Sequence, residues 1–495
     1  MSKILKNYNV LVLCIVGSFV RFLYGYFFEP WNQAPDQLAW ELILEQRNFR
    51  YDHFIHYPHE GGTFLISILA HFVELFTSLS SLTIVAFLID FVVRLIQILV
   101  VKRIFDTKVA SLFGLWTVFA TPAIIPWGSV NFGLHSIASV FPFLLLFLLF
   151  LKKNTVKFHF ACGIFLGLAF WFSYANMILV PVFFLYRLIN RQSIKKWIFS
   201  VLGLATILII HLLVRQFFDA GFRLNELSIG SVRGVDFSLS DVNLFDRLSD
   251  IPKVVANSTL ALPDTNVFMP LLRLIYYVFF FLAAFSFIGL YRKNSFYKGI
   301  FMIIPIVVFF LLIYTFSPFY EIRDKGSYVI FRHLAYIIPV ISLFIVVGLS
   351  SLKYKFLVVL FLVFGMVRPI QLFNSEKLSG SDDVIKAAGW IIGTKLGHDK
   401  NIIEDIVMSN PKDKEILTQG AGWGISAALL FDSKNMDKLE IDLKITELVE
   451  LISEYPKPLQ KNLFTGIKFS FKKNLSPRLN PELLPRIVQK FNRIE

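Results

Sequence analysis

Charged side chains are scarce in this chain of 495 residues. Only 17% of the residues are Asp, Glu, Lys or Arg, whereas 56% are hydrophobic and 55 are Phe. About a quarter of the residues of an ordinary soluble domain are charged. The shortage excludes a water-soluble globular protein and indicates a polytopic membrane protein.

Cysteine is almost absent as well. The two cysteines, Cys14 and Cys162, both fall inside long apolar runs, where a thiol packs as a small apolar group. Neither a disulfide framework nor a cysteine-based metal motif is available from them.

Acidic residues are fewer than basic ones, 35 against 49, which gives a formal net charge of +14. The bases gather beside apolar runs and at the end of the chain. This distribution is typical of contacts with membrane lipids, and no nucleic-acid partner is expected. The first apolar segment ends in RFLYGYFFEPW and lacks a small-residue cleavage site, so we expect a signal anchor that stays in the protein.

Eleven uncharged or nearly uncharged runs approach the roughly 20 residues that cross a bilayer. They lie near 8–28, 83–101, 109–126, 133–151, 158–173, 174–190, 197–214, 270–290, 299–316, 333–351 and 355–372. Segment 62–80 is a further apolar stretch. The sequence therefore predicts an all-α polytopic membrane protein with about eleven transmembrane helices.

The distribution of Lys and Arg in the short connections predicts the orientation of the spans. The bases that mark one side are Lys3, Lys6, Lys102, Arg103, Lys152, Lys153, Arg187, Lys195, Lys196, Arg292, Lys293, Lys353 and Lys355. They fall on alternate loops only if 62–80 is a re-entrant or interfacial helix. In that case the N-terminus is cytoplasmic, and loops 29–60, 215–268 and 317–332 lie outside with the tail. If 62–80 spans the membrane instead, later basic loops face outward and break the rule five times.

The composition changes abruptly after the last run. We expect a membrane domain over 1–372 and a small, mainly helical soluble domain over 373–495, which starts at the polar junction FNSEKLSGSDD. DDVIKAAGWIIGTKL, GISAALLFDS and KITELVELISEY have helical apolar spacing. The Phe- and Ile-rich composition suits a bacterial inner membrane with the tail in the periplasm. No fixed-period repeat is evident, although Gly389–Trp390 and Gly422–Trp423 form similar pairs.

The first outer loop, 29–60, carries six acids against two bases. Within it Asp36, Trp40 and Leu44 recur at helical spacing, while Glu41 and Glu45 lie on an adjacent face. Such a helix is expected to lie along the membrane with its aromatic face in lipid and its carboxylates facing a cavity. A carboxylate there can accept a proton from a nucleophile or hold a divalent cation. The alternative is a set of solvated surface acids.

His56, His59 and Glu60 form the only local cluster with ligand chemistry. Such neighbours can hold a metal ion or act as acid and base. No third His or Cys is fixed nearby, so binding of a metal, binding of substrate and a structural turn at the following glycines all stay open.

Asp90 and Arg94 lie four residues apart inside an expected span, where charges need a partner. One interpretation is a helical ion pair that fixes packing. The other places Arg94, or Asn131 and His135 near the end of another span, on the wall of a substrate cavity. Loop 215–268 supplies further candidates, Arg215, Arg223 and Arg233.

Several segments resemble the C-type glycosyltransferases that use polyprenyl-phosphate sugars, such as the protein O-mannosyltransferases and the bacterial aminoarabinose transferases of lipid A. The resemblance covers about 8–372 and is carried by APDQLAWELIL, HYPHEGGTFLISILAHF, FVVRLIQILVVKRIF, GIFLGLAFWFSYANMILVPVFF and FRHLAYIIPVISLFIVVGL. The chain departs from the family in three places. Asp36–Gln37 stands for an Asp–Glu pair, 56–60 stands for a Lys-Pro-Pro-Leu-like segment, and Tyr174–Ala175–Asn176 stands where a basic residue is frequent.

The resemblance implies that Asp36 is the catalytic carboxylate and that Arg332, before a proline-containing helix, binds the lipid-linked phosphate. A guanidinium suits phosphate oxygens, although Arg332 also fits an interfacial arginine that snorkels to water. The other candidates for substrate or phosphate binding are Glu41, His56, His59, Glu60, Arg94 and His135. No cofactor is certain, and a divalent cation is possible.

The expected function is inverting transfer of a sugar from a polyprenyl-phosphate donor to a lipid, glycan or protein acceptor on the outer face. Inversion is implied by the resemblance alone. An O-antigen-type polymerase or ligase is one alternative, although its charged loop normally lies late in the chain. A lipid or sugar transporter is another, although the two halves show no paired polar interruptions.

Overall fold

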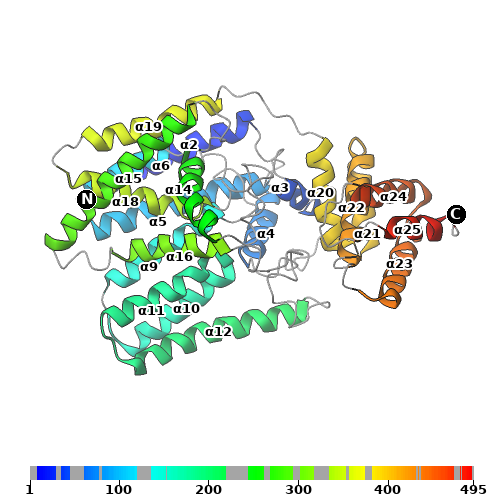
Figure 1. The fold of residues 1–495 in the computed structure, drawn as a ribbon, viewed down its shortest axis with the longest axis horizontal. Coiled ribbons are helices and arrows are strands. Elements are labelled where there is room, and N and C mark those ends of the chain that lie inside the picture. The colour runs from blue at the N-terminus through cyan, green and yellow to red at the C-terminus, as the bar shows by residue number, and fades with distance from the viewer. Residues whose placement is uncertain are drawn as a thin grey trace.

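The computed structural model places most of the chain in helices (Figure 1). It describes residues 8–28, 35–44, 61–76, 81–119, 135–151, 153–218, 244–260, 268–293, 301–316, 334–352, 356–373, 382–397, 399–430, 433, 436–472, 480 and 482–492. None of these residues lies in a β-strand. The all-α prediction is thereby confirmed for the described residues.

An apolar bundle makes up the larger part of the fold. Its helices are α2 (Tyr8–Phe28), α5 (Ser81–Ile104), α6 (Thr107–Phe119), α8 (His135–Ala138), α9 (Val140–Phe150), α10 (Val156–Phe172), the 3₁₀ helix η3 (Tyr174–Ile178), α11 (Leu179–Ile189), α12 (Ile194–Phe218), α15 (Met269–Lys293), α16 (Ile303–Phe316), α18 (Ile338–Ser350) and α19 (Phe356–Phe373). Each of the eleven predicted apolar runs overlaps at least one of these helices. Three of them are long and apolar enough, over their described residues, to cross a membrane: Leu82–Ile104, Ile194–Leu213 and Pro270–Ile288.

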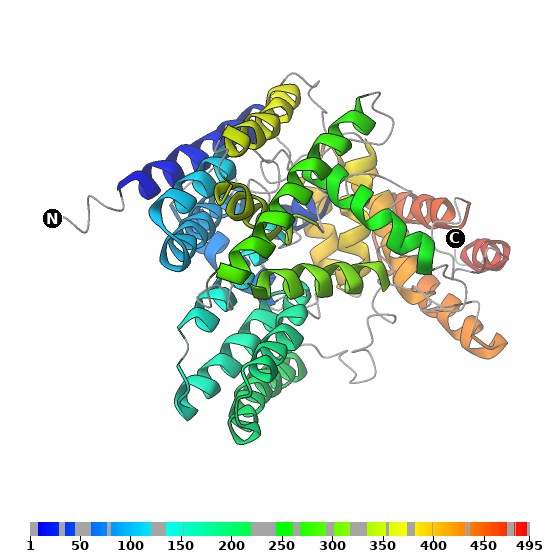
Figure 2. The ribbon, with the colours of Figure 1, turned by 60° about the vertical axis from the view of Figure 1, so that its left-hand side comes forward.

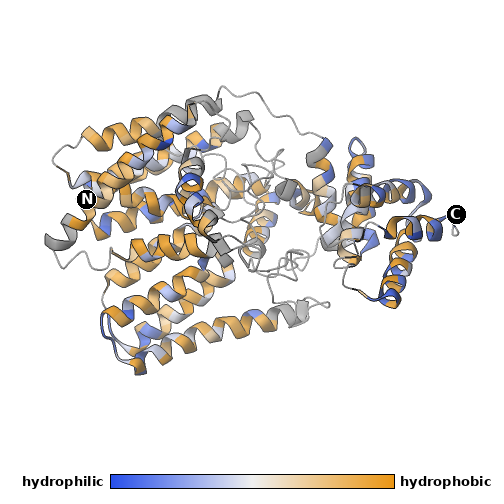
Figure 3. Ribbon diagram, in the orientation of Figure 1, coloured by the Kyte–Doolittle hydropathy of each residue, from blue (hydrophilic) through white to orange (hydrophobic). Residues whose placement is uncertain are grey.

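The outer surface of the bundle is apolar. Phe281 and Phe285 of α15 are 68% and 77% exposed, and apolar residues dominate the bundle helices in Figure 3. Large apolar patches on a protein surface mark a lipid or protein contact. The apolar helices and their surface are compatible with a membrane protein.

The interior is formed around α18, which is apolar on all sides and buried from Ile338 to Leu349. A helix that is hydrophobic all round belongs inside a bundle. It packs closely on α15, because a Cβ added to Gly348 would lie 2.5 Å from the carbonyl oxygen of Ala283. Cys14 and Cys162 are buried and free, as expected for thiols inside apolar helices.

The C-terminal tail folds into helices α20 (Asp382–Leu396), α21 (Lys400–Ser409), α22 (Lys414–Leu429), α23 (Lys438–Ser453), α24 (Lys457–Lys472) and α25 (Leu483–Phe491). DDVIKAAGWIIGTKL and most of KITELVELISEY are helical as predicted, whereas only Gly424–Leu429 of GISAALLFDS is helical, as the end of α22. Trp390 and Trp423 from the two Gly–Trp pairs meet, with ring centroids 5.5 Å apart. In Figure 1 and in the rotated view of Figure 2 these helices lie together at one end of the bundle.

Helices also lie within the expected outer loops or next to them. α4 (Gly61–Glu74) has 14 residues and spans about 21 Å, less than the roughly 30 Å of a hydrocarbon core. α6, α16 and α18 are no longer than α4, so the re-entrant or interfacial placement of 62–80 stays a prediction. The outer connection predicted over 215–268 contains α14 (Leu244–Leu260), with Pro252 inside it. Its place outside the membrane stays a prediction.

Candidate functional site

The acidic helix of the first outer loop is α3 (Pro35–Leu44). Pro35 occupies its first position, where a missing N–H costs nothing, and Asp36 in the first turn is favoured by the helix dipole. α3 packs against α20 of the tail and also contacts α21 and α5. Asp36 therefore starts a helix that is held between the bundle and the tail.

The expectation that the aromatic face of α3 lies in lipid was wrong. Trp40 is completely buried, as are Ala39 and Ile43. All three belong to one cluster of buried side chains that includes Ile391 and Ile392 of α20. α3 is amphipathic as predicted, but its apolar face packs against the tail and not against lipid. Glu41 on the same helix is half-buried.

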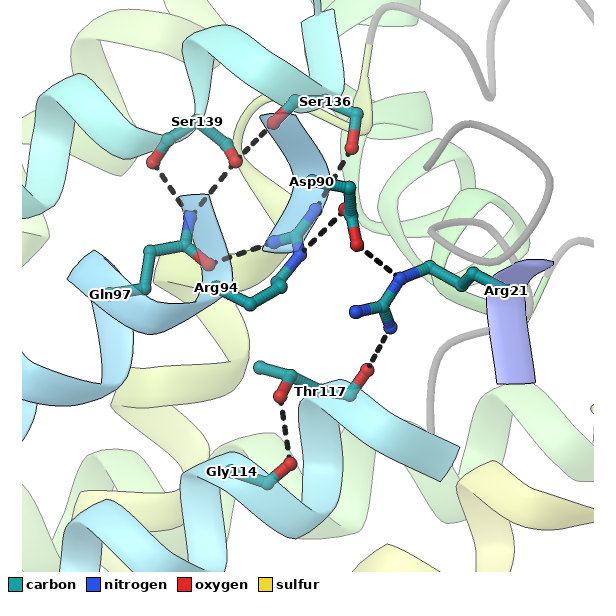
Figure 4. Close-up of polar contacts among 8 residues, drawn as sticks. All are labelled: Arg21, Asp90, Arg94, Gln97, Gly114, Thr117, Ser136 and Ser139. Atoms are coloured by element: carbon teal, nitrogen blue, oxygen red, sulfur yellow. Dashed lines mark hydrogen bonds and ion pairs between the residues drawn. The ribbon is translucent and has the colours of Figure 1, made fainter. Parts of the chain in front are cut away.

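A buried polar network lies inside the bundle (Figure 4). Asp90 of α5 accepts from Nε of Arg21, which belongs to α2, and from Nε of Arg94 at 3.1 Å. Nη1 of Arg21 also donates to the carbonyl oxygen of Thr117 at 2.9 Å. The predicted Asp90–Arg94 ion pair is confirmed, and Arg21 makes it a triad of two guanidinium groups and one carboxylate.

Neutral acceptors complete the shell around Arg94. Its Nη1 donates to Gln97 Oε1 at 2.8 Å and its Nη2 donates to Ser136 Oγ at 2.9 Å. Gln97 in turn donates to both oxygens of Ser139 at 3.0 Å. Every nitrogen of Arg94 thus has a protein partner, which favours the packing interpretation of this residue. Its role in substrate binding stays a prediction.

Sequence reasoning missed Arg21. The available signal was an arginine inside the first apolar run, because such a charge requires a partner at similar depth. Nothing in the sequence names Asp90, 69 positions away, as that partner.

The remaining candidates are less fully described. His135 is the first residue of α8. It directly precedes Ser136, whose hydroxyl accepts a hydrogen bond from Arg94. Arg215 lies in α12. For Asp36, His135 and Arg215 the structure describes the backbone and not the side chain. Outside the described residues lie His56, His59, Glu60, Asn131, Arg223, Arg233 and Arg332.

Two interrupted helices face each other elsewhere in the bundle. η3 separates α10 from α11, and a turn at 334–337 precedes α18. Tyr336 donates to Asn176 Oδ1 at 2.9 Å, and Asn176 Nδ2 donates to the carbonyl oxygen of Ala169 at 2.8 Å. Non-helical backbone at membrane depth is tolerated only inside protein or beside a water-filled cavity. The sequence singled out Tyr174–Ala175–Asn176 as a departure from the family pattern, but it did not predict that Tyr336 bonds to Asn176.

Within the described part of the chain no three His, Cys, Asp or Glu side chains gather as a metal would require. Comparison with protein-family models, curated proteins and solved structures gave no match. Asp36 thus lies in the first turn of a helix packed between the bundle and the tail, and this helix contacts α5, which carries Asp90 and Arg94 of the buried triad.

Proposed function

We propose that the chain is a multi-pass membrane glycosyltransferase that uses a polyprenyl-phosphate-linked sugar. The acceptor is a lipid, a glycan or a protein, and transfer occurs on the outer face of a bacterial inner membrane, on the same side as the tail. The observation that carries the proposal is the position of α3. An acid in its first turn is fixed at the end of an apolar bundle by a buried Trp40, and catalytic groups require such firm support.

In the proposed reaction the Asp36 carboxylate takes the proton of the acceptor hydroxyl or amine. The acceptor atom bonds to the anomeric carbon of the sugar, and the bond from that carbon to the phosphate oxygen breaks. The polyprenyl phosphate leaves with the electron pair. Arg332, or a divalent cation, stabilises its developing charge.

The buried triad supports this assignment indirectly. α5 carries Asp90 and Arg94 and also contacts α3. The hydrogen bonds of the triad join α5 to α2 and to α8, and join α2 to α6. The residues that hold α5 in place therefore also support one of the helices that α3 contacts. We assign Arg21, Asp90 and Arg94 a positioning role in the proposed reaction.

Transfer of radiolabel from a panel of polyprenyl-phosphate sugars tests the proposal. The purified chain in lipid is compared with Asp36→Asn, Arg332→Ala and a matched control, Asp382→Asn. Asp382 is exposed at the start of α20, so Asp382→Asn removes the same charge at a position that is not a candidate residue. Transfer by wild type and Asp382→Asn, with loss in Asp36→Asn of at least about 100-fold, is the expected result. Transfer that is unchanged in Asp36→Asn contradicts it.

A second candidate is a lipid or sugar transporter. It is favoured by the facing interruptions at η3 and 334–337, since broken helices commonly build transporter binding sites. Movement of a fluorescent polyprenyl-phosphate sugar across sealed vesicles distinguishes the two. Flux that survives Asp36→Asn, without label transfer by wild type, supports the transporter.

A further inference from the structure

Arg187 is buried at the end of the bundle opposite α3 and the tail. It lies in the last turn of α11, where α10, α11 and α12 meet (Figure 1). Its side chain is stacked over the ring of Phe183, 4.6 Å from the centroid, and the residue is only 2% exposed. Hydrophilic residues gather at this corner of the bundle in Figure 3.

The helices around Arg187 are held so tightly that the corner is a fixed structure. A Cβ added to Gly163 of α10 would lie 2.0 Å from the carbonyl oxygen of Ser200 in α12. The Ser200 hydroxyl donates to the carbonyl oxygen of His159 at 3.0 Å. Small residues at such a crossing let two backbones touch. α10 and α12 are therefore packed backbone to backbone beside Arg187.

The hydrogen bonds of Arg187 are incomplete. Nη1 donates to Gln192 Oε1, and Nη2 lies 4.0 Å from Cys162 Sγ. Nε is buried and has no partner among the described residues. An arginine has five N–H donors, and the described contacts of Arg187 occupy at most three of them, two of these through long contacts to His159 and Cys162. Buried polar groups normally have partners.

The neighbouring His159 does not fill this gap. Its Nε2 lies 3.0 Å from Asn154 Oδ1 and 3.5 Å from Nη1 of Arg187. One ring nitrogen carries either a proton or a lone pair, so only one of the two contacts is a full hydrogen bond. The shorter contact to Asn154 is the stronger of the two.

A counter-charge is missing too. Arg187 pairs with no carboxylate in the described structure, and from position 107 to position 218 the sequence contains neither Asp nor Glu. The same corner adds Lys153, Lys195 and Arg191, all exposed, and Lys196, which donates to the carbonyl oxygen of Asn154 at 3.1 Å. A buried guanidinium without an anion is costly.

We propose that this corner binds a phosphate group, with Arg187 as its buried anchor and Lys195 and Lys196 at its rim. The ligand is the headgroup of an anionic phospholipid or a free phosphate. Basic pockets between helices bind anionic headgroups in this way. Gln192 is half-buried over Arg187, and a phosphate oxygen that displaces its amide replaces a neutral acceptor with a charged, stronger one. The site does not depend on the proposed sugar transfer.

Thermal unfolding of the purified full chain in zwitterionic micelles tests the site. The probes are dioctanoyl phosphatidylglycerol, dioctanoyl phosphatidylcholine and inorganic phosphate at constant ionic strength. A ligand of the native state raises the melting temperature, and we expect phosphatidylglycerol to raise it by about 3 °C. Arg187→Gln should lose this shift. Lys157→Gln, an equal charge change at an exposed position of α10, should keep it.

The three probes distinguish a lipid headgroup from a free phosphate. An equal shift with inorganic phosphate identifies a free phosphate ligand, whereas a shift with phosphatidylglycerol alone identifies a lipid headgroup. If Arg187→Gln does not fold, the double variant Lys195→Gln/Lys196→Gln takes its place and should weaken the response. The proposal is overturned if no probe stabilises wild type, or if phosphatidylcholine acts as strongly as phosphatidylglycerol. An unchanged response in every folded variant overturns it as well.

Discussion

The hydroxyl of Tyr336 donates a 2.9 Å hydrogen bond to Oδ1 of Asn176, 160 positions earlier in the chain. Both residues are buried, and each stands where a helix is interrupted. The bond ties the start of α18 to the break between α10 and α11. Asn176 also satisfies a carbonyl of α10, so one amide links three segments of the bundle.

Replacement of Tyr336 with Phe should lower the free energy of unfolding by about 1–3 kcal/mol. The substitution leaves the Asn176 carbonyl buried without its donor, and that group keeps its full desolvation cost. Denaturant unfolding in micelles measures the effect.

Tyr455→Phe is the matched control. Tyr455 is also buried, but its hydroxyl has no partner among the described residues, and burial raises its pKa. Removal of an unsatisfied hydroxyl should leave stability unchanged or raise it. Equal losses in both variants would show that the Tyr336 bond contributes nothing specific.

Asp90→Asn should cost about 3–5 kcal/mol, because Arg21 and Arg94 would both stay buried without their counter-charge. Arg94→Gln should cost less, since Asp90 keeps Arg21 as its partner. The ranking is measured by thermal unfolding of both variants. Equal stability of wild type and Asp90→Asn would contradict the triad.

Trp40→Ala should loosen α3 from the tail. Truncation of a buried aromatic side chain costs about 3–5 kcal/mol, and hydrogen exchange should rise along Pro35–Leu44 and along α20. Trp40→Phe should retain most of the protection. Phe72→Ala serves as a control, because Phe72 of α4 is mostly exposed. Exchange that stays slow in Trp40→Ala would mean that other contacts hold α3.

Gly163→Ala should separate α10 from α12 and lower stability by about 1–3 kcal/mol, because the new Cβ meets backbone of Ser200. Gly114→Ala is the comparison. Its Cβ would meet the end of the Leu13 side chain, 2.8 Å away, and that side chain can rotate. A larger loss in Gly114→Ala than in Gly163→Ala would refute the close crossing.

The positions of the bundle helices followed from the sequence because long apolar runs leave the backbone no alternative to internal hydrogen bonds. α14 did not, since it is charged on one face and contains Pro252, and its apolar side needs neighbours that only the fold supplies.

The candidate site was predictable in its residue types but not in its partners. The spacing of Asp36, Trp40 and Leu44 indicates an amphipathic helix, and an apolar face must be covered. Whether lipid or protein covers it depends on the tail, more than 300 positions later in the chain. For the same reason the Asp90–Arg94 pair was visible at a spacing of four, whereas Arg21 on another helix was not.

The tail and the 190–193 connection should be accessible from opposite sides of the membrane. Ser409, in the last turn of α21, and Ser193, before α12, are both exposed. The native thiols of Cys14 and Cys162 are buried, so a membrane-impermeant maleimide should not react with them. It should label Ser409→Cys on intact spheroplasts, and Ser193→Cys only after the membrane is permeabilised. Labelling of both from outside would refute the predicted orientation. It would place the Arg187 corner on the outer face, and the lysines around Arg187 would then break the positive-inside rule.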